Sequence, residues 1–190
     1  MELLEKAIAE KGRVSDGGVL NVGSFVNHQI DVKLLAAMAD EVYSHFRCSG
    51  VNKILTVEAS GIALAVLVAE RFGCRMVFAK KSKALNADGE MYAADCRSYT
   101  RPGNNKITVP KEYLGPEDKV LIVDDFLAVG NAAAALRDIA GQAGSELCGI
   151  TVAVEKGFQG GGDKIREDGI DLLSLAIIDS MEDGKIVFRK

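Results

Sequence analysis

Two adjacent carboxylates, Asp124 and Asp125, directly follow the aliphatic run Val120–Val123 and carry the clearest chemical signal in the chain. The run is too apolar for an edge strand, so the pair is predicted to stand at the mouth of a sheet, where open α/β folds bind ligands. Ionised carboxylates accept hydrogen bonds, and vicinal hydroxyl groups donate them. The pair therefore favours a ligand that carries hydroxyl groups.

A turn of small residues follows the acid pair and opens a predicted helix from Asn131 to Ala143. Five residues form the turn and the helix start: Ala128, Val129, Gly130, Asn131 and Ala132. Glycine allows a tight bend, and the N–H groups at a helix start bind phosphate. Hydroxyl and phosphate recognition therefore stand side by side. The structural alternative is that one aspartate caps the helix and the other is solvated.

The rest of the chain alternates predicted strands with predicted helices. The main strands are expected at Lys53–Val57, Arg75–Ala79, Lys119–Val123, Leu147–Val154 and Leu172–Ile178, and short ones at Val19–Phe25, Ile107–Val109 and Ile186–Phe188. The other helices are expected at 1–11, from an Asp31 N-cap to about Phe46, at Gly61–Phe72 and at Asp163–Asp168. This alternation predicts an α/β fold with a mostly parallel central sheet flanked by helices.

Two further groups of residues stand at predicted strand ends. The first is a turn between a strand and a helix, made of Glu58, Ala59, Ser60 and Gly61. Its structural alternative is Ser60 as a helix N-cap. The second comprises Lys80 and Lys81, which could meet anionic oxygens as point charges, or simply form a solvated face.

The composition limits the function classes. The chain has 190 residues and a net charge of −4, which predicts one domain and argues against general nucleic-acid binding. Its four cysteines follow no metal-binding spacing and suit a reducing compartment. We expect neither a signal peptide, because the first residues form a mixed-charge amphipathic helix, nor a membrane span. Residues from about 81 to 105 lack an apolar period, which predicts a long functional loop.

The stretch from Val120 to Ala132 resembles the signature of the phosphoribosyltransferases, which bind 5-phosphoribosyl-1-pyrophosphate. Nearly the whole chain resembles the bacterial xanthine phosphoribosyltransferases, in the adenine-phosphoribosyltransferase-like branch of the purine/pyrimidine phosphoribosyltransferase family. Four segments carry this resemblance: Asn27–Asp31, Glu58–Ile62, Asp124–Ala128 and Val154–Lys156. The chain departs from the usual signature at Val129 and Ala132, where many relatives have a hydroxyl residue, so backbone amides are left to hold the phosphate.

The resemblance implies a role for each site residue. The catalytic set comprises Asp124, Asp125 and Lys80. The phosphoribosyl pyrophosphate site comprises Glu58, Ala59, Ser60, Gly61, Lys81, Ala128, Val129, Gly130, Asn131 and Ala132. The base site comprises Leu20, Asn27, Phe126 and Lys156. Asn27 can offer a donor or an acceptor to the base, and the sequence leaves its orientation open.

The resemblance also implies the architecture and the reaction. It implies a type I phosphoribosyltransferase fold in one domain, 1–190, with a small hood from about 12–30 and 156–190 and a flexible loop from about 81–105. The implied reaction converts xanthine and phosphoribosyl pyrophosphate to XMP and pyrophosphate in purine salvage. Mg²⁺ would be bound mainly through the substrate, with no protein ligand expected beyond, at most, Asp124. A cytoplasmic homodimer without nucleic-acid or membrane partners is implied.

Two alternatives stay open at this point. The base could be guanine, hypoxanthine, adenine or orotate, although Lys156 disfavours adenine because a donor would face its amino group. The chain could instead be a non-catalytic regulator that senses phosphoribosyl pyrophosphate, although such regulators usually carry an added DNA-binding module. A nucleotide-binding dehydrogenase is disfavoured because no Gly-x-Gly-x-x-Gly follows a strand.

The acid pair generates the first prediction. Asp125→Asn should retain the fold and weaken binding of the sugar, because one ionised acceptor is lost. Steady-state kinetics on the purified variant would measure the effect. Full activity in the variant would remove Asp125 from the sugar site.

Overall fold

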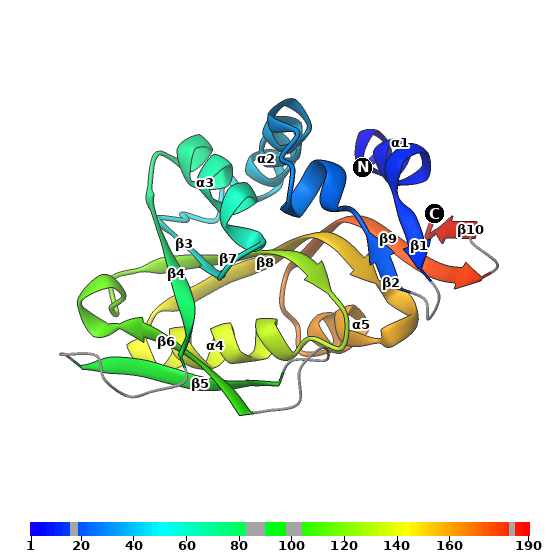
Figure 1. Ribbon diagram of the computed structural model, residues 1–190. Helices are drawn as coiled ribbons and strands as arrows, with labels where there is room; N and C mark the ends of the chain where they lie inside the picture. Colours follow the sequence, from blue (N-terminus) through cyan, green and yellow to red (C-terminus); the bar gives the residue numbers. More distant parts are fainter. Residues whose placement is uncertain (16–18, 83–89, 98–103, 183–184) are drawn as a thin grey trace.

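The computed structural model describes residues 1–15, 19–82, 90–97, 104–182 and 185–190. Their main feature is an eight-stranded sheet in the order β10-β9-β8-β7-β3-β4-β6-β5, and β1 and β2 form a separate ribbon (Figure 1). The strands are β1 Arg13–Ser15, β2 Val19–Asn21, β3 Lys53–Val57, β4 Arg75–Ser82, β5 Met91–Arg97, β6 Asn104–Pro110, β7 Lys119–Leu127, β8 Glu146–Lys156, β9 Leu172–Glu182 and β10 Lys185–Phe188.

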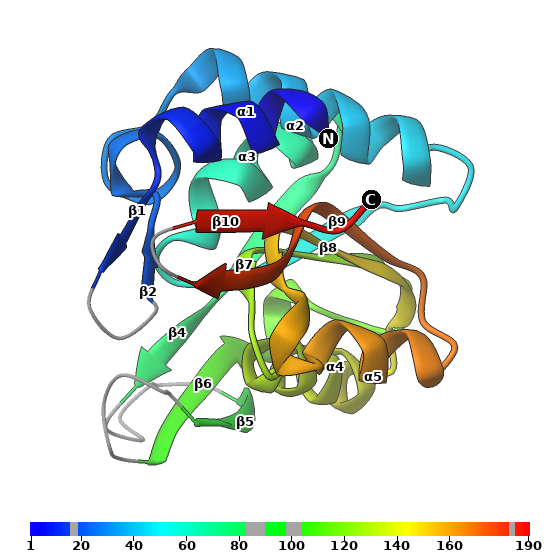
Figure 2. The ribbon, with the colours of Figure 1, turned by 90° about the vertical axis from the view of Figure 1, so that its right-hand side faces the viewer.

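The helices cover both faces of this sheet. They are α1 Glu2–Lys11, α2 Val32–Phe46, α3 Gly61–Phe72, α4 Asn131–Ala143 and α5 Gly161–Glu167, with short turns of helix η1 Gly23–Asn27, η2 Lys111–Tyr113 and η3 Gly157–Gln159. Helices α1, α2 and α3 lie on one face, and α4 and α5 lie on the other (Figures 1 and 2). Among the described helices, none is both long and apolar enough to span a membrane.

Alternating side chains of β7 build the two halves of the core. Leu121 and Val123 pack with the cluster that includes α2 and α3, whereas Val120 and Ile122 pack with the cluster that includes α4. Successive side chains of a strand point to opposite faces, so a strand buried on both faces must be apolar throughout. This explains the unbroken aliphatic run before the acid pair.

The sheet confirms the predicted fold class. Strands β4, β3, β7, β8 and β9 pair in parallel, and antiparallel pairs occur toward the edges, where β10 joins β9 and β6 joins β4 and β5. The predicted bounds of β3, α3 and α4 agree with the structure. Asp31 caps α2 as predicted, because its carboxylate accepts a hydrogen bond from the N–H of Leu34 at 3.2 Å.

Three local expectations need correction. Strand β7 does not end at Val123 but continues to Leu127, so the acid pair belongs to the strand and not to the turn. The region 81–105 is not all loop, since β5 and the start of β6 lie in it; residues 83–89 and 98–103 lie outside the described part. The strand expected at Val19–Phe25 ends at Asn21, and a single π-helical turn follows it.

Strand β5 lies at the edge of the sheet and is held by α4. The side-chain amide of Gln142 accepts a hydrogen bond from the N–H of Ala93 at 3.2 Å and donates one to its carbonyl oxygen at 2.9 Å. Gln142 thus pairs with the backbone of β5 as a neighbouring strand would. The β5–β6 ribbon is therefore tied to the helix that begins at the predicted phosphate-binding turn.

Candidate active site

The acid pair lies on a part of β7 that has a strand on one side only. β3 pairs with β7 only as far as Ile122, because β3 ends at Val57 and the chain turns into α3. On the other side, β8 continues to pair with β7 up to Leu127. Asp124 and Asp125 therefore sit in a strand whose β3-side edge opens toward the turn 58–61.

Gly61 brings that turn against the acid pair. A Cβ atom at Gly61 would lie 3.0 Å from the Oδ1 atom of Asp124 and 2.4 Å from the hydroxyl of Thr56. A side chain at this position would displace one of them, so a glycine is required for the close approach. The start of α3 is thus packed directly on the first aspartate.

Asp124 is a buried carboxyl group beside a second one. Its Oδ1 atom accepts a hydrogen bond from the N–H of Asp125 at 2.9 Å. Burial raises the pKa of Asp124 well above its ordinary value, and the charge of Asp125 adds to this shift. The ammonium of Lys81 acts in the opposite direction and lowers the pKa. A hydrogen-bond donor or cation brought by a ligand would relieve the same unfavourable charge.

A pocket of about 140 Å³ lies at the start of α4. The predicted phosphate-binding residues Ala128–Ala132 line it together with Asp124 and Phe126. Gly130 occupies the N-cap position with φ +90°, a left-handed conformation that favours glycine. Having no side chain, it leaves the entrance to the first turn of α4 to the ligand, where N–H groups and the helix dipole attract phosphate.

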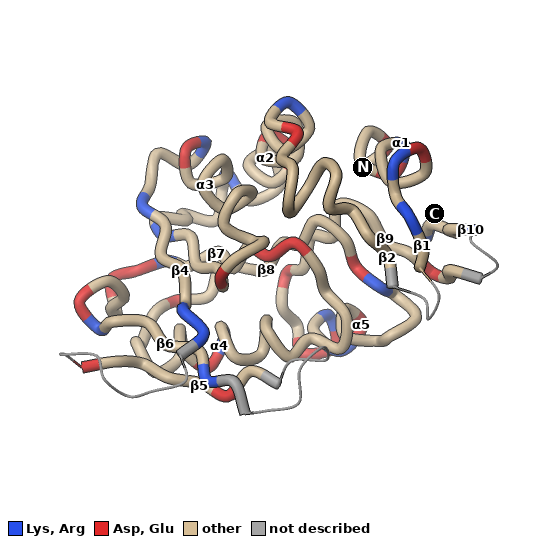
Figure 3. The backbone as a smooth tube through the Cα atoms, viewed as in Figure 1, with Lys and Arg blue, Asp and Glu red and all other residues tan. Residues whose placement is uncertain are grey.

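The two lysines of β4 face opposite sides of the strand, since they are consecutive. Both are exposed, and they form the basic segment on β4 (Figure 3). The charge of Lys81 acts on Asp124, whereas the ammonium of Lys80 lies 5.9 Å from the ring centre of Phe78. The N–H of Lys81 also donates to the carboxylate of Glu58 at 2.5 Å. The structure thus places the backbone of Lys81 beside Glu58 of the other turn, while the roles of both lysine side chains stay predictions.

Asn27 joins the N-terminal segment to the acid pair. Its amide nitrogen donates to the Oδ2 atom of Asp125 at 3.1 Å, across 98 positions of the sequence. A carboxylate only accepts hydrogen bonds, so this contact orients the amide that the sequence left open. Leu20 is buried in the core on β2. The base-binding role predicted for both residues remains a proposal.

Lys156 and Phe126 form the other side of the predicted base site. They stand at the ends of neighbouring strands, and the ammonium of Lys156 lies 5.9 Å from the ring centre of Phe126. Partial burial lowers the pKa of Lys156. A half-buried ammonium gains from an acceptor such as a carbonyl oxygen, and this is the property needed to recognise an oxo group.

The structure also reveals polar residues near the site that the sequence reading missed. The hydroxyl of Thr56 is buried and has no hydrogen-bond partner among the described residues. Glu155, next to Lys156, is fully buried and pairs with Arg166. The signal for the second feature was present, because a glutamate ending an apolar strand needs a partner and the following glycines allow one to approach.

The comparisons with known proteins place the chain in a family. No family model matches the chain. The xanthine phosphoribosyltransferase of Clostridium novyi is 47% identical over 189 residues, and that of Bifidobacterium adolescentis is 47% identical over 192 residues; both alignments cover 100% of each chain. The chain belongs to the xanthine phosphoribosyltransferase family.

The solved structures agree with a type I phosphoribosyltransferase fold. The adenine phosphoribosyltransferase of Giardia lamblia, complexed with 9-deazaadenine, is 25% identical with a TM-score of 0.74, and the match covers 92% of this chain and 96% of that one. The enzyme from Rhodothermus marinus is 19% identical with a TM-score of 0.75, covering 93% and 99%. The fold of the chain therefore confirms the expected similarity to the adenine-phosphoribosyltransferase-like branch.

The oxygen atoms of the acid pair indicate which kind of metal ion would suit the site. Over the part of the chain that the structure describes, no group of three or more His, Cys, Asp or Glu side chains could hold a metal ion. The two carboxylates offer hard oxygen donors, and Mg²⁺ binds through one or two such groups while keeping waters and substrate phosphates as ligands. The donor set therefore fits Mg²⁺ delivered with a phosphorylated substrate.

The raised pKa of Asp124 predicts how stability depends on pH. The unfolded chain loses this proton near the ordinary value of 3.8, whereas the folded chain keeps it to higher pH. The contribution of Asp124 to stability therefore falls as the pH rises from about 3.8 to the raised pKa and does not change further above it. Asp124→Asn removes this loss of stability, because asparagine does not ionise, and it keeps the side-chain oxygen that accepts the hydrogen bond from the N–H of Asp125.

We expect Asp124→Asn to raise the Tm of the ligand-free protein by about 3 °C at pH ~8, with the difference vanishing toward pH ~4. Thermal unfolding across this range would measure it, with Asp138→Asn, an exposed carboxylate on α4, as the control. The activity of Asp124→Asn should fall at least tenfold, on the order of one lost charged hydrogen bond. A variant no more stable than the parent at any pH would contradict this account.

Proposed function

We propose that the chain transfers the phosphoribosyl group of 5-phosphoribosyl-1-pyrophosphate to N9 of xanthine, giving XMP and pyrophosphate in purine salvage. The observation that carries this proposal is the position of Asp124. It lines the pocket at the start of α4 and also lies against Gly61 of the other turn. One acid pair is thus shared by the two turns that would hold the two phosphate ends of the substrate.

In the proposed complex, the ribose lies over the acid pair. Asp124 and Asp125 accept hydrogen bonds from its 2- and 3-hydroxyls, and the backbone N–H groups of 128–132 hold its 5-phosphate. The turn 58–61 and the end of β4, which carries both lysines, lie beside the pyrophosphate. The C1–oxygen bond breaks, pyrophosphate leaves with the electron pair, and N9 of the base, having lost its proton to water, bonds to C1.

The residues of this chain would act mainly by positioning and by charge stabilisation. The transition state gathers positive charge on the sugar ring, next to the carboxylates, and negative charge on the leaving pyrophosphate, next to Lys80 and Lys81. Mg²⁺, when bound through the substrate, would neutralise part of the pyrophosphate charge. We assign no residue as a general base, because xanthine is a fairly acidic nucleobase and loses its proton easily.

Recognition of the base is assigned to Asn27, Phe126, Lys156 and Leu20. The ammonium of Lys156 would donate to the 6-oxo group, and the ring of Phe126 would pack beside the base. The contact of Asn27 with Asp125 supports this arrangement, because it holds the Asn27 amide beside a carboxylate that we assign to the sugar. The segments 12–30 and 156–190 would form the hood over the base, and their elements gather at the β9–β10 end of the sheet (Figure 2).

We also propose a cytoplasmic homodimer. The four cysteines are free thiols, as a reducing compartment requires. Exposed apolar side chains on α2 and α3, namely Val32, Tyr43 and Val66, suit a face covered by a second copy. Light scattering on the eluted protein would measure the mass in solution. A monomer at micromolar concentration would contradict the dimer.

A competition assay tests the proposed reaction. The protein, Mg²⁺ and phosphoribosyl pyrophosphate are mixed with xanthine, guanine, hypoxanthine or adenine, and pyrophosphate release is measured. We expect the highest kcat/KM with xanthine. The highest value with adenine would contradict the role of Lys156, and tight binding without any product would favour a regulator that senses the sugar pyrophosphate.

Lys156 generates a sharper prediction. Lys156→Met keeps the aliphatic stem beside Phe126 and removes the donor, so the KM for xanthine should rise at least tenfold, and the preference for 6-oxo purines should weaken. The KM for phosphoribosyl pyrophosphate should stay within about twofold, which corresponds to less than ~0.5 kcal/mol. Lys185→Met, at an exposed position of β10, is the control. Unchanged kinetics with every purine would remove Lys156 from the base site.

A further inference from the structure

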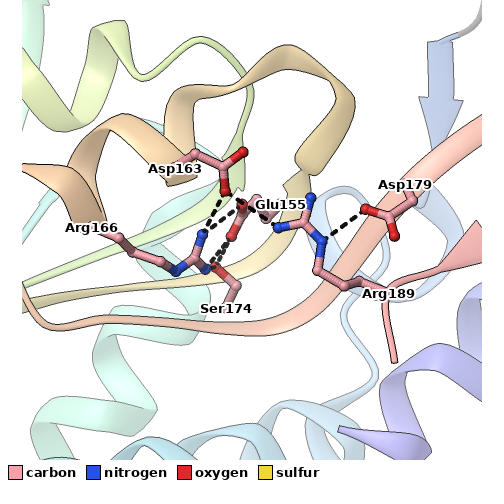
Figure 4. A network of polar contacts seen from close by, with 6 residues as sticks. All are labelled: Glu155, Asp163, Arg166, Ser174, Asp179 and Arg189. Carbon is pink, nitrogen blue, oxygen red and sulfur yellow. Dashed lines mark hydrogen bonds and ion pairs between the residues drawn. The ribbon is translucent and has the colours of Figure 1, made fainter.

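An ion pair whose carboxylate is fully buried lies one residue from Lys156 of the proposed base site. Glu155 in β8 is 0% exposed, and its carboxylate accepts two hydrogen bonds from Arg166 of α5, at 3.0 and 2.7 Å (Figure 4). The hydroxyl of Ser174 in β9 also donates to it. This bidentate contact raises the pKa of Arg166. The pair therefore fastens α5 to two neighbouring strands at the residue next to Lys156.

The network continues to the end of the chain. Asp163, also on α5, lies 3.6 Å from Arg166 and 3.3 Å from Arg189. Arg189 in turn pairs with Asp179 of β9 at 2.8 Å (Figure 4). These outer groups are all more exposed than Glu155, so their pairs contribute little by themselves. Within this network, removing the partner of Glu155 would be the most destabilising change, because it would leave a buried charge unpaired.

The first turn of α5 touches both this network and the proposed phosphate-binding turn. A Cβ atom at Gly162 would lie 2.0 Å from the Oε1 atom of Glu155. A Cβ atom at Gly161 would lie 2.2 Å from the carbonyl oxygen of Ala128 and 2.9 Å from the nitrogen of Gly130. Two consecutive glycines thus let α5 pack on the buried carboxylate with one residue and on the backbone of the turn with the other.

These contacts assign a function to the pair. We infer that Glu155 and Arg166 are positioning residues: they press the first turn of α5 against the backbone of 128–130 and so fix the N–H groups that would hold the 5-phosphate. The inference rests on the proposed function, because that function gives this turn to the sugar phosphate. Neither residue touches the substrate; both act through Gly161.

A merely structural role makes a different prediction. If the pair only stabilised the fold, its loss would reduce the folded fraction and leave the affinity of folded molecules unchanged. A positioning role changes the affinity for the phosphorylated sugar more than the affinity for the base. The test therefore compares two dissociation or Michaelis constants in folded protein, rather than total activity.

The main variant is Arg166→Met, with Arg166→Lys as the conservative variant. Arg137→Gln is the matched control, because it removes another ion pair that ties α5 to its surroundings: Arg137 of α4 lies 2.8 Å from Asp168 at the C-terminal end of α5, and both side chains are partly exposed. Calorimetry with phosphoribosyl pyrophosphate and Mg²⁺ would give the Kd. Amide hydrogen exchange in the ligand-free protein would measure how rigidly the N–H groups of 128–132 are held.

We expect Arg166→Met to raise the Kd for phosphoribosyl pyrophosphate at least tenfold, with the KM for xanthine within about threefold of the parent's, a difference of roughly 0.7 kcal/mol or less. Exchange at 128–132 should accelerate. Arg166→Lys should show an intermediate effect because it keeps the charge but loses the fork of two donors. Arg137→Gln should match the parent in all three measurements.

Gly161→Ala tests the transmission step with the ion pair intact, and it serves if Arg166→Met does not fold. It should show the same selective loss of sugar-phosphate affinity. Equal affinity in parent and folded Arg166→Met or Gly161→Ala would overturn the inference, as would an equal rise of both constants or the same shift in Arg137→Gln. If the parent itself binds no phosphoribosyl pyrophosphate, the proposed function fails, and the inference fails with it.

Discussion

The burial of a carboxyl group beside another carboxyl group is the constraint on which the rest of the site depends. Asp124 is 7% exposed, and its pKa is raised by burial and by Asp125. Such a group destabilises the empty fold, so the surrounding structure must hold it in place. The parallel strand β8 does this on one side through main-chain pairing, and the close approach of Gly61 does it on the other. The stability that comes from burying the apolar clusters on both faces of β7 offsets this cost.

Polar contacts from distant parts of the chain converge on this strand. Asn27 reaches Asp125 from the N-terminal segment, and the charge of Lys81 reaches Asp124 from β4. In our inference, Glu155 and Arg166 act through α5 on the backbone of 128–130, which follows the acid pair. The proposed sugar, base and phosphate positions thus all border β7 or a strand paired with it.

The parts that could be predicted from the sequence are those set by local signals. The bounds of α3 and α4 follow from turns rich in small residues and from a run of helix formers, and the Asp31 cap is read from one residue and its neighbours. The end of β7 could not be predicted, because it depends on how far β8 runs alongside it. Strand β5 was missed for the same reason, and β6 was predicted only at Ile107–Val109, since these strands gain their order from pairing and not from an apolar period. The contact of Asn27 with Asp125 joins residues 98 apart, and no local pattern encodes it.

The side-chain amide of Gln142 hydrogen-bonds both backbone groups of Ala93, and this has a consequence for self-association. β5 is the outermost strand of the sheet, and an outermost strand offers unpaired N–H and C=O groups to any other extended chain. A side chain from α4 already fills that position at Ala93, so a foreign strand would have to displace it first. The glutamine thereby blocks one position of this edge against strand addition, at the end of the sheet opposite β10.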